Sequence, residues 1–116
     1  MYFLLWLLLI CLVAYGSVMP SIAPPNKWHL DKFMHFGANY AIALFPLYLC
    51  RSRWSSYCTI MAVIMFGIAI EIIQQNIPGR EASVGDVLAN IAGVLAAFST
   101  VYIMKFLLKK RKNNTR

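Results

Sequence analysis

Long apolar runs separated by short polar segments dominate the chain. Four runs are evident, over residues 2–19, 36–50, 57–74 and 87–108. A helix needs about 20 residues to cross the hydrocarbon core of a bilayer, so the first and fourth runs are long enough alone. The second run reaches this length only if its helix begins near Asp31, and the third carries Glu71 and Gln74 in its last turn.

These runs predict helices, because backbone groups inside lipid must be hydrogen-bonded within their own segment. We place membrane spans at about residues 2–20, 31–50, 56–75 and 86–108, followed by a basic tail over 109–116. Sixty per cent of the 116 residues are hydrophobic and 13% are charged, which is too apolar for a soluble domain of this size. The predicted fold class is all-α, a single integral membrane domain forming a four-helix bundle.

The first run could instead be a cleaved signal peptide. It has no Lys or Arg before its apolar core and is longer than a signal-peptide core, so we interpret it as a span. In the second span, Pro46 is expected to kink the helix and to leave the carbonyl of Ile42 without its helical donor.

The net charge of +7 indicates topology rather than nucleic-acid binding. Arg51 and Arg53 lie between the second and third runs, and most other basic residues lie in the tail. Cytoplasmic loops carry an excess of Lys and Arg, so the 51–56 loop and the C-terminus are expected in the cytoplasm. Four spans put the N-terminus there too, in a plasma (inner) membrane protein. The tail could also contact anionic lipids.

Polar residues within the runs are predicted to meet at the outer ends of three helices. Residues three or four apart on a helix share a face. Three such polar stripes occur: Asp31, His35 and Asn39; Glu71 and Gln74; Asp86 and Asn90. An acid at mid-bilayer costs roughly 2.5–3.5 kcal/mol on insertion scales, so these side chains should face one another rather than lipid. The turn predicted at Pro78 and Gly79 would return Arg80 to this end, where its guanidinium could bind a carboxylate or a phosphate.

Several of these residues also have a purely structural interpretation. Ser83 and Asp86 have the S-x-x-D spacing of a capping box. Asp31 could complement the dipole of its helix, and Asn90 could hydrogen-bond between helices. Glu71 could form a structural ion pair with Arg80.

Two stretches resemble the signature regions of the VanZ-like family: DKFMHFGANY and EIIQQNIPGREASVGDVLANIAG. The matching positions are Asp31, Lys32, His35, Phe36, Tyr40, Glu71, Gln74, Pro78, Gly79, Arg80, Ser83, Asp86, Asn90 and Gly93. Ala97 stands where the pattern has a second glycine. The resemblance implies an integral membrane protein of the bacterial envelope. The namesake of the family is associated with low-level resistance to the glycopeptide teicoplanin, and nothing in this chain selects that antibiotic.

Three functions remain open. The favoured hypothesis is an outward-facing site that recognises an envelope lipid or a lipid-linked cell-wall precursor. Its candidate ligand-binding residues are Lys32, Gln74, Arg80, Ser83, Asp86 and Asn90. The second is a membrane enzyme acting on a lipid headgroup, with His35 as general base oriented by Asp31 or Glu71. The third is a small scaffold in which the polar cluster only fixes the bundle.

Metal and cofactor binding have no diagnostic spacing in the sequence. Asp31, His35, Glu71 and Asp86 could offer ligands to Mg²⁺ or Ca²⁺, but their spacing matches no known metal motif. The three cysteines form no C-x-x-C pair. The sequence therefore predicts neither a metal nor a cofactor, and it does not indicate the oligomeric state.

Overall fold

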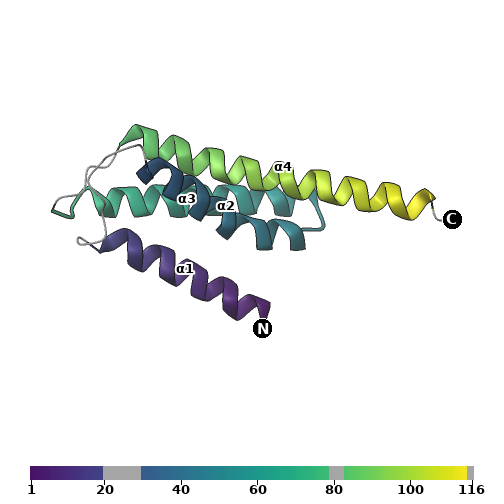
Figure 1. Cartoon of the computed structure of the whole chain (residues 1–116), viewed down its shortest axis with the longest axis horizontal. Coiled ribbons are helices and arrows are strands. Elements are labelled where there is room, and N and C mark those ends of the chain that lie inside the picture. The colour runs from purple at the N-terminus through teal and green to yellow at the C-terminus, as the bar shows by residue number, and fades with distance from the viewer. Residues whose placement is uncertain (20–29, 79–82, 115–116) are drawn as a thin grey trace.

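The computed structural model describes residues 1–19, 30–78 and 83–114. Four helices account for the regular structure of these residues: α1 (Tyr2–Val18), α2 (Leu30–Leu49), α3 (Arg53–Gln74) and α4 (Val84–Asn114). They run alternately up and down, so that both termini point toward the same end of the molecule (Figure 1). The predicted all-α class is confirmed.

The helix limits agree with the apolar runs except at the C-terminus. α2 begins at Leu30, so Asp31 lies in its first turn, as the length argument required. α4 continues to Asn114 and includes most of the segment predicted as a tail. Lys and Arg are good helix formers, and their positive charge is favourable at the C-terminal end of a helix dipole, which explains the extension.

α2 and α4 form the closest helix pair in the bundle. A Cβ added at Gly93 of α4 would lie only 2.3 Å from the carbonyl oxygen of Phe36 in α2. The buried core consists of small and medium apolar residues: Ile42, Ala43, Leu47, Val63, Val94, Ala97 and Val101. Small residues at such an interface let helix backbones approach closely. Ala97 is fully buried here, so its methyl group fits where the family pattern has a glycine.

α1 packs on the side of this core without burying any residue of its own. Leu9, Ile10 and Val13 are partly buried against the core. Figure 1 shows α1 on one side of the bundle and α4 on the other. α1 therefore forms a wall rather than a central element.

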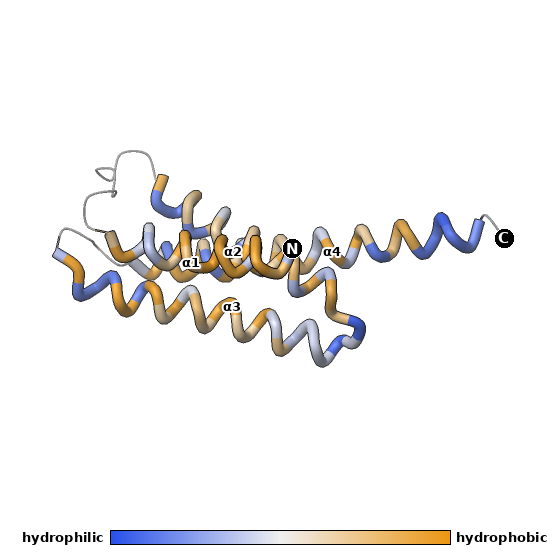
Figure 2. Tube along the Cα trace, turned by 90° about the horizontal axis from the view of Figure 1, so that it is seen from below, coloured by the Kyte–Doolittle hydropathy of each residue, from blue (hydrophilic) through white to orange (hydrophobic). Residues whose placement is uncertain are grey.

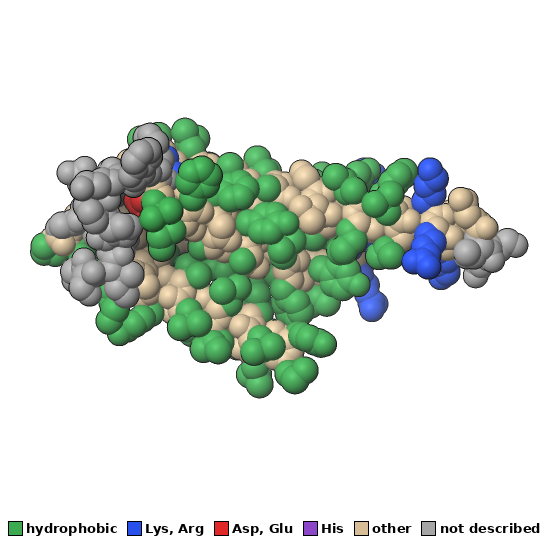
Figure 3. All heavy atoms as spheres, viewed as in Figure 1, with side chains coloured by type: hydrophobic (Ala, Val, Ile, Leu, Met, Phe, Trp, Pro, Cys, Tyr) green, Lys and Arg blue, Asp and Glu red, His purple; other side chains and the backbone are tan. Residues whose placement is uncertain are grey.

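The surface is strongly apolar along the length of the helices. α3 and α4 are long and apolar enough to cross a membrane, and only 22% of the most apolar window of each is buried, whereas a core helix of a soluble protein would be mostly buried. α1 is apolar but shorter. Hydrophilic residues gather near the ends of the helices (Figure 2), and hydrophobic side chains cover the face seen in Figure 3, with Lys and Arg toward the C-terminus. Such a surface suits a lipid environment.

α2 carries polar residues through its first turns. These residues are Asp31, Lys32, His35 and Asn39. Because of them, α2 is not among the helices that are apolar enough to cross a membrane. Those first turns carry the candidate functional site.

Candidate functional site

The polar side chains of three helices meet at one end of the bundle. They come from the first turns of α2 and α4 and from the last turn of α3. The buried polar or charged residues in the described part of the chain are His35, Asn39, Glu71, Gln74, Asp86 and Asn90. The prediction that these side chains face one another rather than lipid is confirmed.

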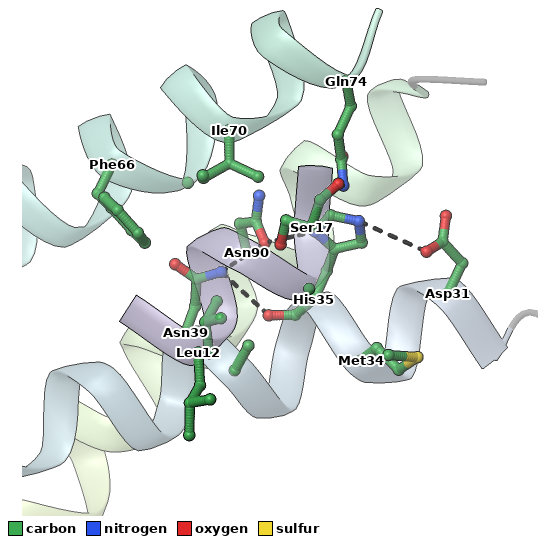
Figure 4. A pocket seen from close by; sticks show the side chains of 14 residues that line it. Leu12, Ser17, Asp31, Met34, His35, Asn39, Phe66, Ile70, Gln74 and Asn90 are labelled. Carbon is green, nitrogen blue, oxygen red and sulfur yellow. Dashed lines mark hydrogen bonds and ion pairs between the residues drawn. The ribbon is translucent and has the colours of Figure 1, made fainter. Parts of the chain in front are cut away.

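Two asparagines fix the orientation of the His35 ring. His35 Nδ1 lies 3.2 Å from Asn90 Oδ1. Asn39 Nδ2 donates to the same Asn90 oxygen at 2.6 Å and to the backbone oxygen of His35 at 3.1 Å. With Nδ1 donating to Asn90, the Nε2 atom points toward acids, at 3.6 Å from Asp31 Oδ1 and 3.9 Å from Glu71 Oε2 (Figure 4 draws the Asp31 contact).

Ser83 joins the start of α4 to the end of α3. Its hydroxyl accepts the backbone N–H of Asp86 at 3.2 Å and donates to Asp86 Oδ2 at 2.6 Å. The capping interpretation is therefore confirmed for Ser83, whereas Asp86 does not make the reciprocal bond of a capping box. The backbone N–H of Ser83 also donates to Glu71 Oε1 at 2.9 Å. Lys32 approaches the other oxygen of Asp86, with 3.6 Å between Nζ and Oδ1.

A cavity of about 280 Å³ opens beside this cluster, between α1, α2 and α3. Its polar end is formed by His35, Asn39, Gln74 and Asn90, and its apolar walls include Leu12, Val13, Phe66 and Ile70. Gln74 Nε2 donates to the backbone oxygen of Ser17 at 3.0 Å, which ties α3 to α1 at the edge of the cavity. Figure 4 shows these polar and apolar side chains arranged around one space.

Two amide atoms at the polar end have no hydrogen-bond partner among the described residues. They are Asn39 Oδ1 and Asn90 Nδ2, and both residues are almost completely buried, at 4% and 1% exposure. Both atoms lie against Gly67, at 3.1 and 3.0 Å from the position that a Cβ would take there. Buried amide groups are normally hydrogen-bonded, so these two atoms are unusual. Both are enclosed, and a ligand in the cavity would reach them only after the side chains move.

The predicted site residues divide between the cavity and the adjacent cluster. Asp31, His35, Gln74 and Asn90 line the cavity. Lys32, Glu71, Ser83 and Asp86 belong to the ionic cluster beside it. Arg80 lies outside the described residues. That any of these residues binds or transforms a ligand stays a prediction.

The apolar walls of the cavity were not predicted from the sequence. Leu12 and Val13 come from a helix that is apolar on all sides, so no pattern marked them. Gly67 is a small residue within an apolar run and carried no signal either. Asn39 was predicted in the polar stripe with His35, because it follows His35 by one helical turn, but it was not among the candidate ligand-binding residues.

The fold and the site define a class: a helical membrane protein with a buried polar cluster at one end and a side cavity next to it. The profile of the VanZ/LLP1 family matches residues 10–105, so the chain belongs to this family. The matched range includes both motifs and the larger part of all four helices. Comparison with curated proteins and with solved structures finds no match.

Proposed function

We propose that this chain is a VanZ-like protein of the bacterial envelope whose side cavity binds an envelope lipid or a lipid-linked cell-wall precursor. The observation that carries the proposal is the cavity itself. One end is formed by the polar residues His35, Asn39, Gln74 and Asn90, and the walls are apolar. A ligand that satisfies both parts must be amphiphilic.

The position of the cluster supports the same conclusion. In the proposed topology the four helices cross the plasma membrane, both termini are cytoplasmic, and the loops near residues 20–30 and 75–86 are outside. The ends of α2, α3 and α4 that carry the polar cluster then lie at the depth of the outer headgroups. A lipid could enter sideways between the helices and keep its acyl chains in the bilayer.

The charges of the described cluster favour a headgroup rich in hydroxyl, amine or amide donors. Asp31, Glu71 and Asp86 are three acids, and Lys32 is directed at one of them. A phosphate placed directly among these acids would be repelled. Lys32, one of the candidate ligand-binding residues, is engaged with Asp86, so binding of a phosphate here requires a further positive charge.

A second candidate function is catalysis at the headgroup. It is favoured by His35, which lines the cavity and is held in one orientation by Asn90. In this version His35 would act as general base, oriented by Asp31 or Glu71. The hydroxyl of Ser83 is engaged in capping α4, so it is a poor nucleophile for such a reaction.

The test is retention of lipid by the purified protein, measured by native mass spectrometry. Val13→Trp would fill the cavity from α1, which buries no residue and should tolerate the change. Leu8→Trp is the matched control, because Leu8 is an exposed residue of the same helix that does not line the cavity. We expect wild type and Leu8→Trp to carry a defined lipid and Val13→Trp to lose it. Equal retention by all three would overturn the proposal, and a lipid of changed mass would favour catalysis.

A further inference from the structure

We propose that the ionic cluster is a divalent-cation site formed by Asp31, His35 and Asp86, with Glu71 as a fourth ligand. One potential ligand atom from each of Asp31, His35 and Asp86 lies within 4.8 Å of the other two. These residues come from the first turns of two different helices, α2 and α4, and Glu71 comes from the end of α3. The site adds an ion to the proposed lipid recognition and does not depend on it.

The separations fit ligands around one ion better than direct contacts. His35 Nε2 is 3.6 Å from Asp31 Oδ1 and 3.9 Å from Glu71 Oε2, which is too long for a hydrogen bond. Carboxylate oxygens bind Ca²⁺ at about 2.3–2.6 Å, so two ligands at right angles around that ion are about 3.3–3.7 Å apart and two on opposite sides about 4.6–5.2 Å apart. Smaller ions would need only a modest inward movement of the side chains.

Two buried carboxylates each present an oxygen without a hydrogen bond. Glu71 Oε2 and Asp86 Oδ1 have no hydrogen-bond partner in the described part of the chain, and the two residues are 3% and 2% exposed. The second oxygen of each is held by Ser83, through its backbone N–H and its hydroxyl respectively. Hydrogen bonds to the outer atoms of a ligand are a common feature of metal sites, because they fix the ligand's orientation. These two buried oxygens are the independent observation that points to a ligand at the cluster.

The His35 ring resembles the two carboxylates, because one of its polar atoms is hydrogen-bonded and the other is directed at the cluster. Its Nδ1 side is hydrogen-bonded to the amide oxygen of Asn90, which directs the lone pair of Nε2 at the acids. A metal-bound histidine almost always donates its other ring N–H to a carbonyl or carboxylate oxygen. With Nε2 directed at two carboxylates, the position between them is surrounded by potential metal ligands.

Lys32 is the group that a metal ion would displace. Its Nζ is 3.6 Å from Asp86 Oδ1, and its side chain is 38% exposed, so it can turn outward. Lys32, His35, Asp31, Glu71 and Asp86 are the charged or titratable groups of the described residues that face one another here. One imidazole nitrogen with two or three carboxylate oxygens suits Zn²⁺ and Mn²⁺. Where the proposed function also holds, the ion would supply the positive charge that a phosphate headgroup requires.

The experiment is a titration of the full chain, purified in detergent and stripped with a chelator, with MnCl₂ and ZnCl₂. Isothermal calorimetry gives the stoichiometry, and the loss of the free Mn²⁺ signal in electron paramagnetic resonance gives the affinity. We expect one ion per chain, and a loss of more than about tenfold in affinity for Asp31→Asn and for His35→Gln. Lys32→Gln should bind equally or more tightly. His29→Gln, which removes the chain's other histidine, is the control and should bind like wild type.

Stability of every variant is measured by thermal unfolding in the same detergent. Asp31 is the decisive position, because its side chain is 40% exposed and its loss should leave the fold intact. Absence of binding to the wild type, or equal affinity in wild type and Asp31→Asn, would overturn the metal site. The titration contains no lipid, so its failure is distinct from failure of lipid recognition.

Discussion

The indole N–H of Trp6 in α1 donates a 2.8 Å hydrogen bond to the backbone oxygen of Ile42 in α2. Pro46, four residues after Ile42, has no N–H, so this carbonyl lacks its normal helical partner. The sequence-based expectation that Pro46 leaves the Ile42 carbonyl available is confirmed. With the Gln74–Ser17 bond near the other end of the helix, α1 is fastened at two levels.

Trp6→Phe should therefore lower the free energy of unfolding by about 1 kcal/mol, the net value of a typical hydrogen bond. The loss is larger, up to about 3 kcal/mol, if the Ile42 carbonyl finds no other donor. The measurement is reversible unfolding of the detergent-solubilised protein. Trp54→Phe is the matched control, because Trp54 is 76% exposed at the start of α3. A Trp6→Phe protein as stable as Trp54→Phe would show that the bond does not hold α1.

Gly93→Ala should destabilise the bundle by about 1–3 kcal/mol, the range observed for overpacking. The new Cβ would lie 2.3 Å from the Phe36 oxygen, and because this is a backbone atom, α2 and α4 must separate. Gly37→Ala is the control on α2, where an added Cβ meets nothing within 4 Å. That control should gain up to about 1 kcal/mol from helix propensity. Equal stability of the two variants in the same unfolding assay would contradict the close approach of α2 and α4.

The polar cluster was predictable because the options of a polar residue in an apolar run are few. Glu71 and Asp86 could face lipid at high cost or face other polar groups, and the four-residue spacing fixed which neighbours shared their faces. The cavity was not predictable, since its wall on α1 consists of residues such as Val13 in a uniformly apolar helix. The ligand distances in the ionic cluster depend on how far each helix is shifted along its neighbour, which local spacing does not determine.

Gly67→Ala should weaken lipid retention several-fold in native mass spectrometry. The added methyl would stand 3.0 Å from Asn90 Nδ2 and 3.1 Å from Asn39 Oδ1, so both amides must move from their positions at the polar end of the cavity. Gly16→Ala adds the same methyl group to another lining residue, at a position with nothing within 4 Å, and should retain lipid. Loss of lipid in both variants to the same degree would indicate that cavity volume matters and that the amides do not.

The topology prediction places both termini in the cytoplasm. Arg51 and Arg53 lie in the loop expected to be cytoplasmic, and Lys105 extends the positive charge to α4, where its Nζ donates to the backbone oxygens of Leu47 and Cys50. Both chain termini point toward this end of the molecule (Figure 1).

A C-terminal fusion to alkaline phosphatase should therefore be inactive and a fusion to green fluorescent protein fluorescent, because each reporter works on only one side of the membrane. Replacing Arg51 and Arg53 by Glu should increase phosphatase activity, since it removes the charge that retains this loop inside. An active phosphatase on the unmodified chain would reverse the orientation and put the polar cluster at the cytoplasmic face, where an outer-leaflet lipid could not reach it.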